Sequence, residues 1–556
     1  MSEVLDLAER LRAVSDDELA HILRARLTNP SAIRDFFDLA EQLLQPRNME
    51  NWVSSLSRDA LEKLSAGSQS NDPLIQFLSN RKVALSGFAQ EPGYAQGERP
   101  SGLEASAGIH AFEATLVITE LIYELEQRMM REMGKSGIGL PDVKRLVALT
   151  GKDLDYVRSV FDLARAADLV TPKEERWRLT SRAADWSASG IQARLQLLAT
   201  TWRELLGSYA TKSIADRLTK GENLDAALRS EFPLEKFTET SRYGKALVFA
   251  ELLGFSVNGF SLPWTTELLT GSAEKAVGLL AAHVPAPTDR IIVQADLSII
   301  APGPLSAGVE RSLRAFVETE QSSLASRYRI TPLSVSHALE SGLNIDLVRE
   351  TLENLSGAKL PQPVEYLLND ALKRFGRIRI IDDESTGGCQ IRAGEPTLLT
   401  ELANDTRLRP YALLRLDSET LGSRFSGEIV YYGLREVGIS AIRTDKNGEV
   451  LSPARFVPIE TDSPTSDSIG ELIARLRETD ARLGSSADDD SILRQITLAI
   501  KTKAKLEVTF VGQDAEERVL LLEPTGVANG RMRARDRKAD IERTLPLSNI
   551  TAVRLV

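Results

Sequence analysis

Residues 140–180 read LPDVKRLVALTGKDLDYVRSVFDLARAADLVTPKEERWRLT and carry the strongest local pattern in the chain. Pro141 suits the first turn of a helix and Gly151 suits a helix end, so this part predicts a short helix. A second helix is expected to begin near Asp153, followed by a β-hairpin over residues 171–180. This order of elements is that of a winged helix. The apolar positions expected to be buried are Val143, Leu146, Val147, Leu154, Val157, Phe161 and Ala164.

The predicted winged helix (residues 135–182) supplies the first candidate contacts to nucleic acid. These contacts are Lys152, Tyr156 and Arg158 on the second helix, and Lys173, Arg176 and Arg178 on the hairpin. Asp153, Asp155 and Asp162 on the same helix would face the phosphate backbone and oppose binding. The hairpin is better suited to DNA, because its cations surround Trp177. Winged helices also serve as protein-interaction modules, so that alternative stays open.

A second candidate lies near the C-terminus, in the run RMRARDRK at residues 531–538. Side chains alternate across a strand, so its arginines are predicted to project from one face. Guanidinium groups side by side repel one another unless an anion bridges them, which favours a phosphate backbone or an anionic ligand. The alternative is a solvated edge strand protected by its charge. The candidate contacts are Arg531, Arg533, Arg535, Arg537 and Lys538.

The segments before the α+β region predict a largely helical half of a multidomain α+β chain. Helical spacing of apolar residues over 1–86 predicts an N-terminal helical bundle. The Gly/Pro/Gln/Ser-rich residues 87–105 predict a linker. Residues 106–284 then predict a second helical region, which contains the winged helix.

The later segments predict strands as well as helices. Residues 285–457 predict a mixed α+β domain that opens with a strand-like run at residues 291–301. The Ser/Thr/Asp/Glu-rich residues 458–490 predict a linker with one short helix. Residues 491–556 predict a small β-barrel, in which Asn529-Gly530 marks a hairpin turn.

Composition and charge narrow the classes of function. The chain has 556 residues, 42% hydrophobic and 26% charged, as in ordinary folded multidomain proteins. Its net charge of −11 argues against a protein that coats nucleic acid non-specifically. Two segments are nevertheless mildly basic: residues 131–182 hold eleven Lys/Arg against eight Asp/Glu, and residues 491–556 hold twelve against eight. The single cysteine, Cys389, together with the lack of an expected signal peptide or membrane span, predicts a cytoplasmic protein.

Motifs for catalysis are missing from the sequence. A phosphate loop ending in the GKS of residues 134–136 would need glycine at position 129, which is methionine. The acidic residues 382–384 follow a predicted strand, as in a magnesium-binding box, but no phosphate loop precedes them. The histidines lie far apart, with no cysteine or histidine at ligand spacing. We therefore expect no ATPase motor, no metal, no cofactor and no enzymatic activity.

Three stretches resemble the helicase-associated domain named after the N-terminal region of XPB-type helicases. They are IIVQADLSIIAPG (residues 291–303), YRITPLS (residues 328–334) and LPQPVEYL (residues 360–367). LAERL (residues 7–11) and DELAHILRAR (residues 17–26) resemble the start of the same bacterial proteins. The resemblance implies association with DNA unwinding, repair or transcription. It implies no helicase activity, because these motifs are architectural and the motor motifs are missing.

The C-terminal segment resembles the WYL-type β-barrel of bacterial regulators. The residues that carry this resemblance are AI (499–500), LEVTF (506–510), LEP (522–524) and LSNI (547–550). Such domains bind nucleic acid or nucleotide-like ligands, so the resemblance implies a similar role here. The Trp-Tyr-Leu signature is absent, which leaves the arginine row as the expected recognition element.

Three hypotheses of function follow from these patterns. The leading one is a DNA-binding accessory protein that works with a separately encoded helicase or nuclease in repair, recombination or transcription. The second is a ligand-responsive transcriptional regulator with the winged helix on DNA and the C-terminal domain as sensor. The third is a protein–protein scaffold that never contacts DNA.

Overall fold

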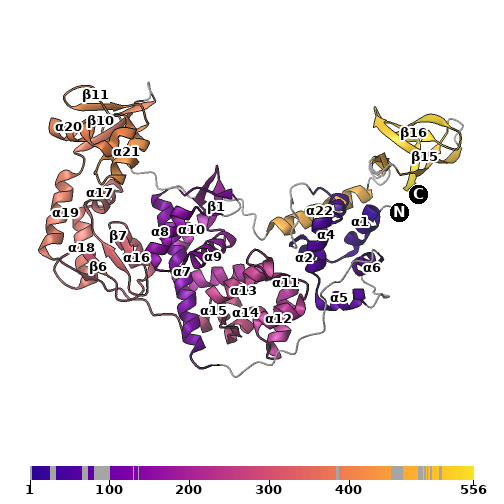
Figure 1. Cartoon of the computed structure of the whole chain (residues 1–556), viewed down its shortest axis with the longest axis horizontal. Helices are drawn as coiled ribbons and strands as arrows, with labels where there is room; N and C mark the ends of the chain where they lie inside the picture. The colour runs from indigo at the N-terminus through magenta and orange to yellow at the C-terminus, as the bar shows by residue number, and fades with distance from the viewer. Residues whose placement is uncertain are drawn as a thin grey trace. The chain divides into compact units, whose positions relative to one another are not determined.

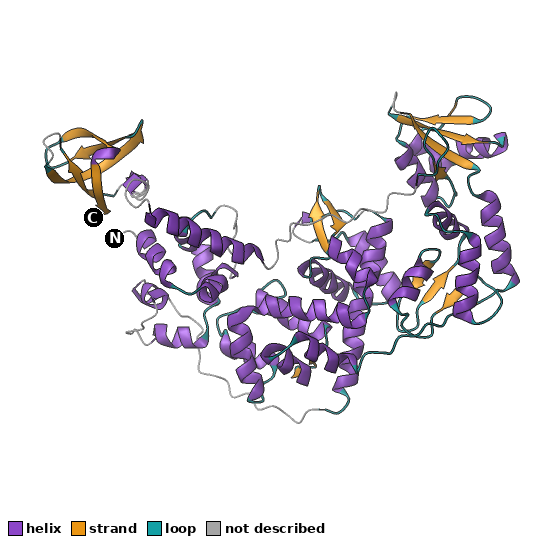
Figure 2. Ribbon diagram, turned by 180° about the vertical axis from the view of Figure 1, so that it is seen from behind, coloured by secondary structure: helices purple, strands orange, loops and turns teal. Residues whose placement is uncertain are grey.

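The structure is a computed structural model, shown in Figures 1 and 2. It describes residues 3–24, 33–65, 73–80, 100–128, 130–134, 137–383, 387–451, 467–485, 492–493, 496–497, 499–500, 504–512 and 516–555. The chain separates into two compact units. Unit 1 comprises Met1–Gln96, Leu206–Lys245 and Ser463–Val556, and unit 2 comprises Gly97–Leu205 and Ala246–Asp462. Helices and several small sheets make the chain a multidomain α+β protein, as predicted.

Short helices build the N-terminal part of unit 1. They are α1 (Glu3–Ala13), α2 (Asp16–Arg24), α3 (Phe36–Leu43), α4 (Pro46–Ser54), α5 (Arg58–Ser65) and α6 (Pro73–Asn80). Asp35 starts α3, because its carboxylate accepts hydrogen bonds from the backbone N–H groups of Phe37 and Asp38, each at 2.9 Å. Fully buried leucines such as Leu7 and Leu11 form the core between these helices.

Helix α22 (Asp467–Ser485) gives its segment a different role from the predicted linker. Arg477 of α22 donates hydrogen bonds to the carbonyl oxygens of Arg12 at 2.7 Å and Val14 at 2.6 Å. Helical spacing gives α22 one apolar face, which needs a partner surface. The residues of this face that are buried in the N-terminal core are Leu472, Ile473 and Leu476. Residues 467–485 are therefore part of a folded core.

Helix α11 (Ile191–Thr219) passes from unit 2 into unit 1 at a kink. Gly207 at the kink has φ 76 and ψ 160, which glycine adopts without a steric penalty. Unit 1 continues with α12 (Leu224–Glu231) and the start of α13 (Arg242–Leu252). Arg58 donates a hydrogen bond to the carbonyl oxygen of Ser230 at 2.8 Å. This contact joins residues 206–245 to the N-terminal helices.

The C-terminal strands of unit 1, predicted as a small β-barrel, form a five-stranded antiparallel sheet that the pairings of the described residues do not close. The order is β17-β16-β15-β14-β18, and among the residues described no pairing joins the two edge strands. The first half of β15, up to Leu522, pairs with β14, and the second half, from Glu523, pairs with β16, with a register shift between Pro524 and Gly526. Asn529 and Gly530 form the predicted two-residue turn, with φ 53 and 70. The strands are β14 (Leu506–Val511), β15 (Glu517–Ala528), β16 (Arg531–Asp536), β17 (Ile541–Pro546) and β18 (Ile550–Leu555).

Unit 2 is built around the long helix α7 (Leu103–Gln127). This helix is long and apolar enough to cross a membrane, but 67% of its most apolar window is buried inside the protein, as in a core helix. A Cβ at Gly108 would lie 1.9 Å from the carbonyl oxygen of His283, so glycine allows this close approach. The helices in this part of unit 2 include α8 (Leu140–Thr150), α9 (Leu154–Ala166), α10 (Ser181–Ala188), α14 (Pro263–Thr270) and α15 (Ala273–Ala281), with the short hairpin strands β3 (Ser256–Val257) and β4 (Phe260–Ser261).

The first α+β core of unit 2 surrounds a four-stranded sheet of order β5-β6-β8-β7. The run at residues 291–301, predicted as one strand, is a hairpin of two. Asp296 accepts a hydrogen bond from the backbone N–H of Ser298 at 3.1 Å, and Leu297 turns with φ 72. The elements are β5 (Ile292–Val293), β6 (Ser298–Ile300), α16 (Ala307–Arg314), β7 (Glu318–Gln321), β8 (Arg327–Arg329), α17 (Pro332–Glu340), α18 (Ile345–Ser356) and α19 (Gln362–Arg374).

The second α+β core surrounds a five-stranded sheet of order β11-β12-β10-β9-β13, in which only β9 and β13 run parallel. Asp382 of the predicted acidic box accepts hydrogen bonds from the backbone N–H of Gly427 at 2.5 Å and from Arg443 at 2.9 Å. It therefore supports the start of a helix, while Glu384 lies outside the described residues. The elements are β9 (Ile378–Asp383), β10 (Gly388–Ala393), α20 (Pro396–Asn404), β11 (Leu414–Arg415), β12 (Thr420–Ser423), α21 (Gly427–Glu436) and β13 (Ile442–Arg443).

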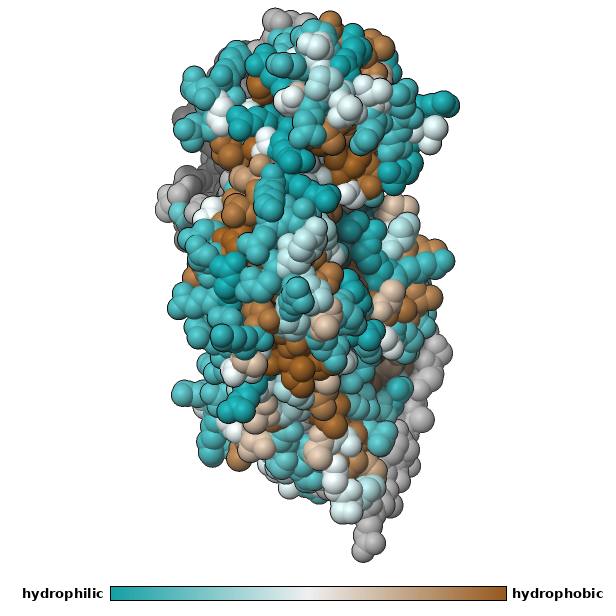
Figure 3. Space-filling view, turned by 90° about the vertical axis from the view of Figure 1, so that its left-hand side faces the viewer, coloured by the Kyte–Doolittle hydropathy of each residue, from teal (hydrophilic) through white to brown (hydrophobic). Residues whose placement is uncertain are grey.

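On the face drawn in Figure 3, hydrophilic side chains separate the hydrophobic patches.

Candidate nucleic-acid interface

The helix–helix–hairpin order predicted for residues 140–180 is present in unit 2 (Figure 1). Helix α8 ends at Gly151, which has φ 67 and donates its N–H to the carbonyl oxygen of Val147 at 2.8 Å. Asp153 starts α9 by accepting a hydrogen bond from the backbone N–H of Tyr156 at 2.7 Å. The hairpin strands are β1 (Val170–Lys173) and β2 (Arg176–Leu179).

Most of the predicted apolar positions in these two helices are buried. Val147 is only half-buried, and Leu154 is 36% exposed in the first turn of α9, so the prediction for Leu154 is wrong. A residue in a first turn lies at the edge of the helix's buried face, which explains its exposure. The buried positions are Val143, Leu146, Val157, Phe161 and Ala164.

The cations predicted at α9 lie within ion-pair distance of glutamate or aspartate side chains of the same chain. Lys152 Nζ lies 2.5 Å from Glu113 and 5.4 Å from the centre of the Tyr156 ring. Arg158 lies 3.6 Å from Asp155. Tyr156 is half-buried rather than exposed, and burial raises the pKa of its hydroxyl. The start of α9 therefore offers little uncompensated positive charge to a phosphate backbone.

The hairpin carries its predicted cations on its outer side, but its tryptophan faces inward. Trp177 is 3% exposed and packs edge-on against Phe161, with ring centres 4.7 Å apart. Its indole N–H donates a hydrogen bond to the carbonyl oxygen of Gly137 at 2.9 Å. Trp177 therefore anchors the hairpin and does not stack on a ligand. The hairpin cations are the exposed Lys173 and Arg176 and the half-buried Arg178.

Glu174 and Glu175 form the turn of the hairpin, and their φ angles are 54 and 59. Turns of this kind favour Asn-Gly, since a β-carbon strains the left-handed backbone. We expect the double substitution Glu174→Asn with Glu175→Gly to stabilise the hairpin by about 1 kcal/mol. Slower hydrogen exchange of the hairpin amides would show this. The variant with Gln at both positions removes the same charges but keeps the strain, so equal exchange rates in the two variants would contradict the account.

The arginines of β16 project outward as predicted. Arg531, Arg533 and Arg535 are exposed, and they alternate with buried Met532 and Ala534. On the neighbouring strand β17, the residues directly opposite the three arginines are Pro546, Thr544 and Glu542, in that order.

The two ends of the arginine row differ in their counter-charges. Arg535 lies 3.0 Å from Asp540, and Arg537, in the turn after β16, lies 2.7 Å from Glu523. Within the described part of the chain, no carboxylate lies within ion-pair distance of Arg531 or Arg533. Lys538 is exposed beside them in sequence and donates its backbone N–H to Asp536 at 3.1 Å. Arg531 and Arg533 are therefore the strongest candidates for phosphate contact.

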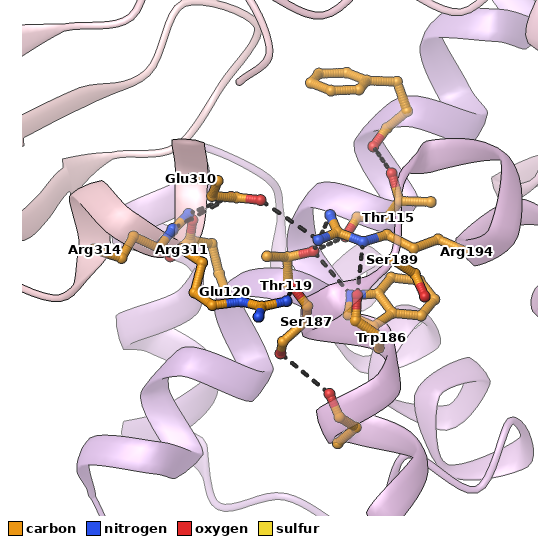
Figure 4. Close-up of polar contacts among 12 residues, drawn as sticks. Thr115, Thr119, Glu120, Trp186, Ser187, Ser189, Arg194, Glu310, Arg311 and Arg314 are labelled. Atoms are coloured by element: carbon orange, nitrogen blue, oxygen red, sulfur yellow. Dashed lines mark hydrogen bonds and ion pairs between the residues drawn. The ribbon is translucent and has the colours of Figure 1, made fainter. Parts of the chain in front are cut away.

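A buried charge cluster in unit 2 was not predicted from the sequence (Figure 4). Arg314 on α16 contacts Glu120 on α7 through both carboxylate oxygens and lies 3.2 Å from Glu310. Its guanidinium also lies over the Tyr123 ring at 4.2 Å. Burial alone would lower the pKa of Arg314, but Glu120 and the neighbouring groups raise it well above its usual value. No spacing rule could reveal a pair 194 residues apart in sequence.

The carboxyl group of Glu340 on α17 has a raised pKa. Burial raises its pKa from 4.5 to about 6, and it accepts a hydrogen bond from the Tyr431 hydroxyl at 2.7 Å. This bond joins the first α+β core to helix α21 of the second. Because both partners belong to packed cores, we interpret Glu340 as structural.

Stability should therefore fall as pH rises through this range. The folded pKa lies above the unfolded one, so the folded state binds the proton more tightly, and about 2 kcal/mol is lost as pH rises from 4.5 through 6. Hydrogen exchange of α17 and α21 amides across this range measures the loss. Glu340→Gln should remove this part of the pH dependence, whereas Glu436→Gln, at an exposed position of α21, should keep it. Equal pH dependence in both variants would contradict the assignment.

Among the described residues, no group of three or more His, Cys, Asp and Glu side chains could hold a metal ion. The GKS motif is described only at Gly134, because Lys135 and Ser136 lie outside the described residues.

Comparison with known proteins relates one segment of unit 2 to helicases. Residues 291–417 match the family described as helicase conserved C-terminal domain. The DNA 3'-5' helicase XPB of Mycobacterium tuberculosis is 25% identical over 134 residues, 24% of each chain. The DNA 3'-5' helicase XPB of Kineococcus radiotolerans is 26% identical over 140 residues, 23% of this chain and 25% of that protein. The chain thus spans about a quarter of the length of the relatives it matches, and it is a helicase-related protein.

Proposed function

We propose that this chain is a DNA-binding accessory protein that works with a separately encoded helicase or nuclease. The observation that carries the proposal is the outward pair Arg531 and Arg533, which lacks counter-charges among the described residues. A pair of this kind fits adjacent phosphates on a nucleic-acid backbone. The match of residues 291–417 to a helicase domain family supports a role together with a DNA-unwinding enzyme.

The hairpin of the winged helix supplies a second DNA contact in this proposal. Lys173 and Arg176 are exposed on the hairpin, and Lys152 and Arg158 near α9 lie within ion-pair distance of Glu113 and Asp155. The proposal places this further phosphate contact on the exposed hairpin side chains. In this proposal, the C-terminal segment, whose sequence resembles WYL-type domains, also binds nucleic acid, with the arginine row as its recognition element in place of the absent Trp-Tyr-Leu signature.

The proposal assigns no ATP hydrolysis to this chain. The sequence has methionine at position 129, where a phosphate loop needs glycine, and the acidic residue Asp382 binds a helix N-terminus and Arg443. The helicase names belong to relatives of which this chain spans about a quarter. An ATPase assay with the purified chain, with and without DNA, should give no turnover above background. DNA-stimulated turnover would overturn this part of the proposal.

Binding of labelled duplex, forked and single-stranded DNA to the full chain tests the central part. We expect binding at low salt that weakens as salt is added, because phosphate contacts release counterions. No binding to any of these DNAs at low salt would overturn direct DNA contact and favour the protein–protein scaffold. Tight binding confined to paired half-sites would instead favour the transcriptional regulator.

A further inference from the structure

A third short segment pairs with the hairpin of β1 and β2 in unit 2. Arg131 lies opposite Arg176 of β2 in an antiparallel bridge. The backbone N–H of Trp177 donates a hydrogen bond to the carbonyl oxygen of Met130 at 2.9 Å and holds this segment against β2. On the other side of β2, Lys173 of β1 lies opposite Arg176. Arg176 therefore has a cation opposite it on each side.

One face of this three-stranded arrangement is strongly basic. Side chains alternate between the two faces of a strand, and residues directly opposite each other share a face. The cationic face consists of Arg131, Thr171, Lys173, Arg176 and Arg178.

The nearby carboxylates occupy none of the paired positions of the cationic face. By the same alternation, Glu132 lies on the other face, which also holds the buried Trp177. Glu174 and Glu175 form the turn at the tip of the hairpin. The indole N–H of Trp177 bonds to Gly137 and anchors the arrangement, so the cations project from a packed element.

The cations crowd one another on this face. Neighbouring strands lie about 4.8 Å apart, so Lys173, Arg176 and Arg131 span only about 10 Å across the strands. Like charges directly opposite each other destabilise a sheet. Within the described part of the chain, no carboxylate lies within ion-pair distance of the exposed Arg131 or Lys173. A ligand with closely spaced negative charges, such as a nucleic-acid backbone, would offset the repulsion.

Helix α9 differs from the cationic face, because each of its arginines has an aspartate beside it. Arg158 lies 3.6 Å from Asp155, and Arg165 lies 3.4 Å from Asp162. These carboxylates oppose phosphate contact at α9. Contact through the cationic face alone reaches phosphates, which carry no direct sequence information.

We propose that the cationic face binds the phosphate backbone of DNA without sequence preference, with Arg131 as a contact residue beside the hairpin cations. This assignment rests on the proposed DNA binding, and it adds to that function a contact surface built from three segments of unit 2. In this arrangement α9 makes no base contact.

Fluorescence anisotropy of the full chain with labelled duplex DNA tests the proposal. Arg131→Gln with Lys173→Gln should weaken binding about 10-fold at 0.1 M salt and lower the slope of log affinity against log salt by about 1.8, since two phosphate contacts are lost. The matched control, Arg158→Gln with Arg165→Gln on α9, removes the same charge and should leave both quantities nearly unchanged. A loss in this control as large as in the first variant would overturn the proposal.

Two further measurements complete the test. Thermal unfolding of the Arg131→Gln with Lys173→Gln variant should occur at the wild-type temperature or above it, because like-charge repulsion is removed. Two duplexes of equal length and unrelated sequence should bind the wild-type chain equally tightly, and a strong preference for one would overturn the lack of sequence preference. If the wild-type chain binds DNA and the variant binds it equally well, the cationic face is not a contact and the proposed function stands. If the wild-type chain binds no DNA at low salt, the proposed function fails as well.

Discussion

Replacing Glu120 by alanine should destabilise unit 2 by about 3–5 kcal/mol, the usual loss when one partner of a buried ion pair is removed. The side chains of Glu120 and Arg314 are 2% and 6% exposed, so water cannot compensate the arginine that remains. Among the residues that the structure describes, Arg314 would keep only Glu310 as a charged partner. Because α7 carries one member of the pair and α16 the other, the loss should appear in both helices.

Hydrogen exchange of α7 and α16 amides, measured with urea unfolding of the full chain, would report this loss. The double substitution Glu120→Leu with Arg314→Met should recover most of the stability, since apolar side chains of similar volume remove both buried charges. Arg229→Ala breaks an exposed pair with Asp225 and serves as the control, with an expected loss below about 1 kcal/mol. A loss in Glu120→Ala no larger than in this control would contradict the role given to the buried cluster.

Replacing Arg531 and Arg533 together by glutamine should weaken duplex DNA binding on the order of 50-fold at 0.1 M salt. Each lost phosphate contact also lowers the slope of log affinity against log salt by about 0.9, so the slope should fall by about 1.8. We expect this large loss because the residues opposite Arg531 and Arg533 on β17 are Pro546 and Thr544, which carry no charge that could offset the arginines. Arg535 and Arg537, which have carboxylate partners, should contribute less.

Fluorescence anisotropy with labelled duplex DNA over a series of salt concentrations measures both quantities. The matched control replaces Arg229 and Arg374 by glutamine, which gives the same change in net charge at arginines that pair with their own helices. If both double variants lose equal affinity, binding reflects net charge alone and the arginine row has no special role. An unchanged salt slope in the first variant would also contradict the proposed contact.

Features that depend on neighbouring residues in the sequence could be predicted well. Gly151 and Asp153 set the boundary between α8 and α9 through a glycine end and a side-chain cap. The turn at Asn529 and Gly530 and the outward alternation of the arginines in β16 follow from equally local rules. These predictions are confirmed because each depends on the backbone preferences of a few adjacent residues.

Features that depend on distant partners could not be predicted from one sequence. Lys152 was predicted to be exposed, but Glu113 lies within 2.5 Å of it from another helix. The predicted linker helix is part of the N-terminal core, since its apolar face is buried there. The C-terminal strands were predicted as a small β-barrel, but among the described residues no pairing joins the edge strands β17 and β18. For Lys152 and for the linker helix, the deciding contact comes from a residue far away in sequence.

The proposed role also bears on which polypeptide hydrolyses ATP. Its similarity to the two XPB helicases extends over about a quarter of either protein. The proposal therefore places ATP hydrolysis on a partner polypeptide and DNA contact on β16 and the hairpin. It predicts that, once the two proteins are separated, DNA binding stays with this chain and ATP hydrolysis stays with the partner.

Affinity purification of the chain from its native cells, with and without nuclease treatment, tests this central claim most directly. The account predicts that a separate helicase or nuclease co-purifies with the wild-type chain. If DNA holds the two together, nuclease treatment or the Arg531→Gln with Arg533→Gln variant should release the partner, whereas a direct protein contact should survive both. Recovery of the chain without any such partner, together with ATP hydrolysis by the chain alone, would contradict the account.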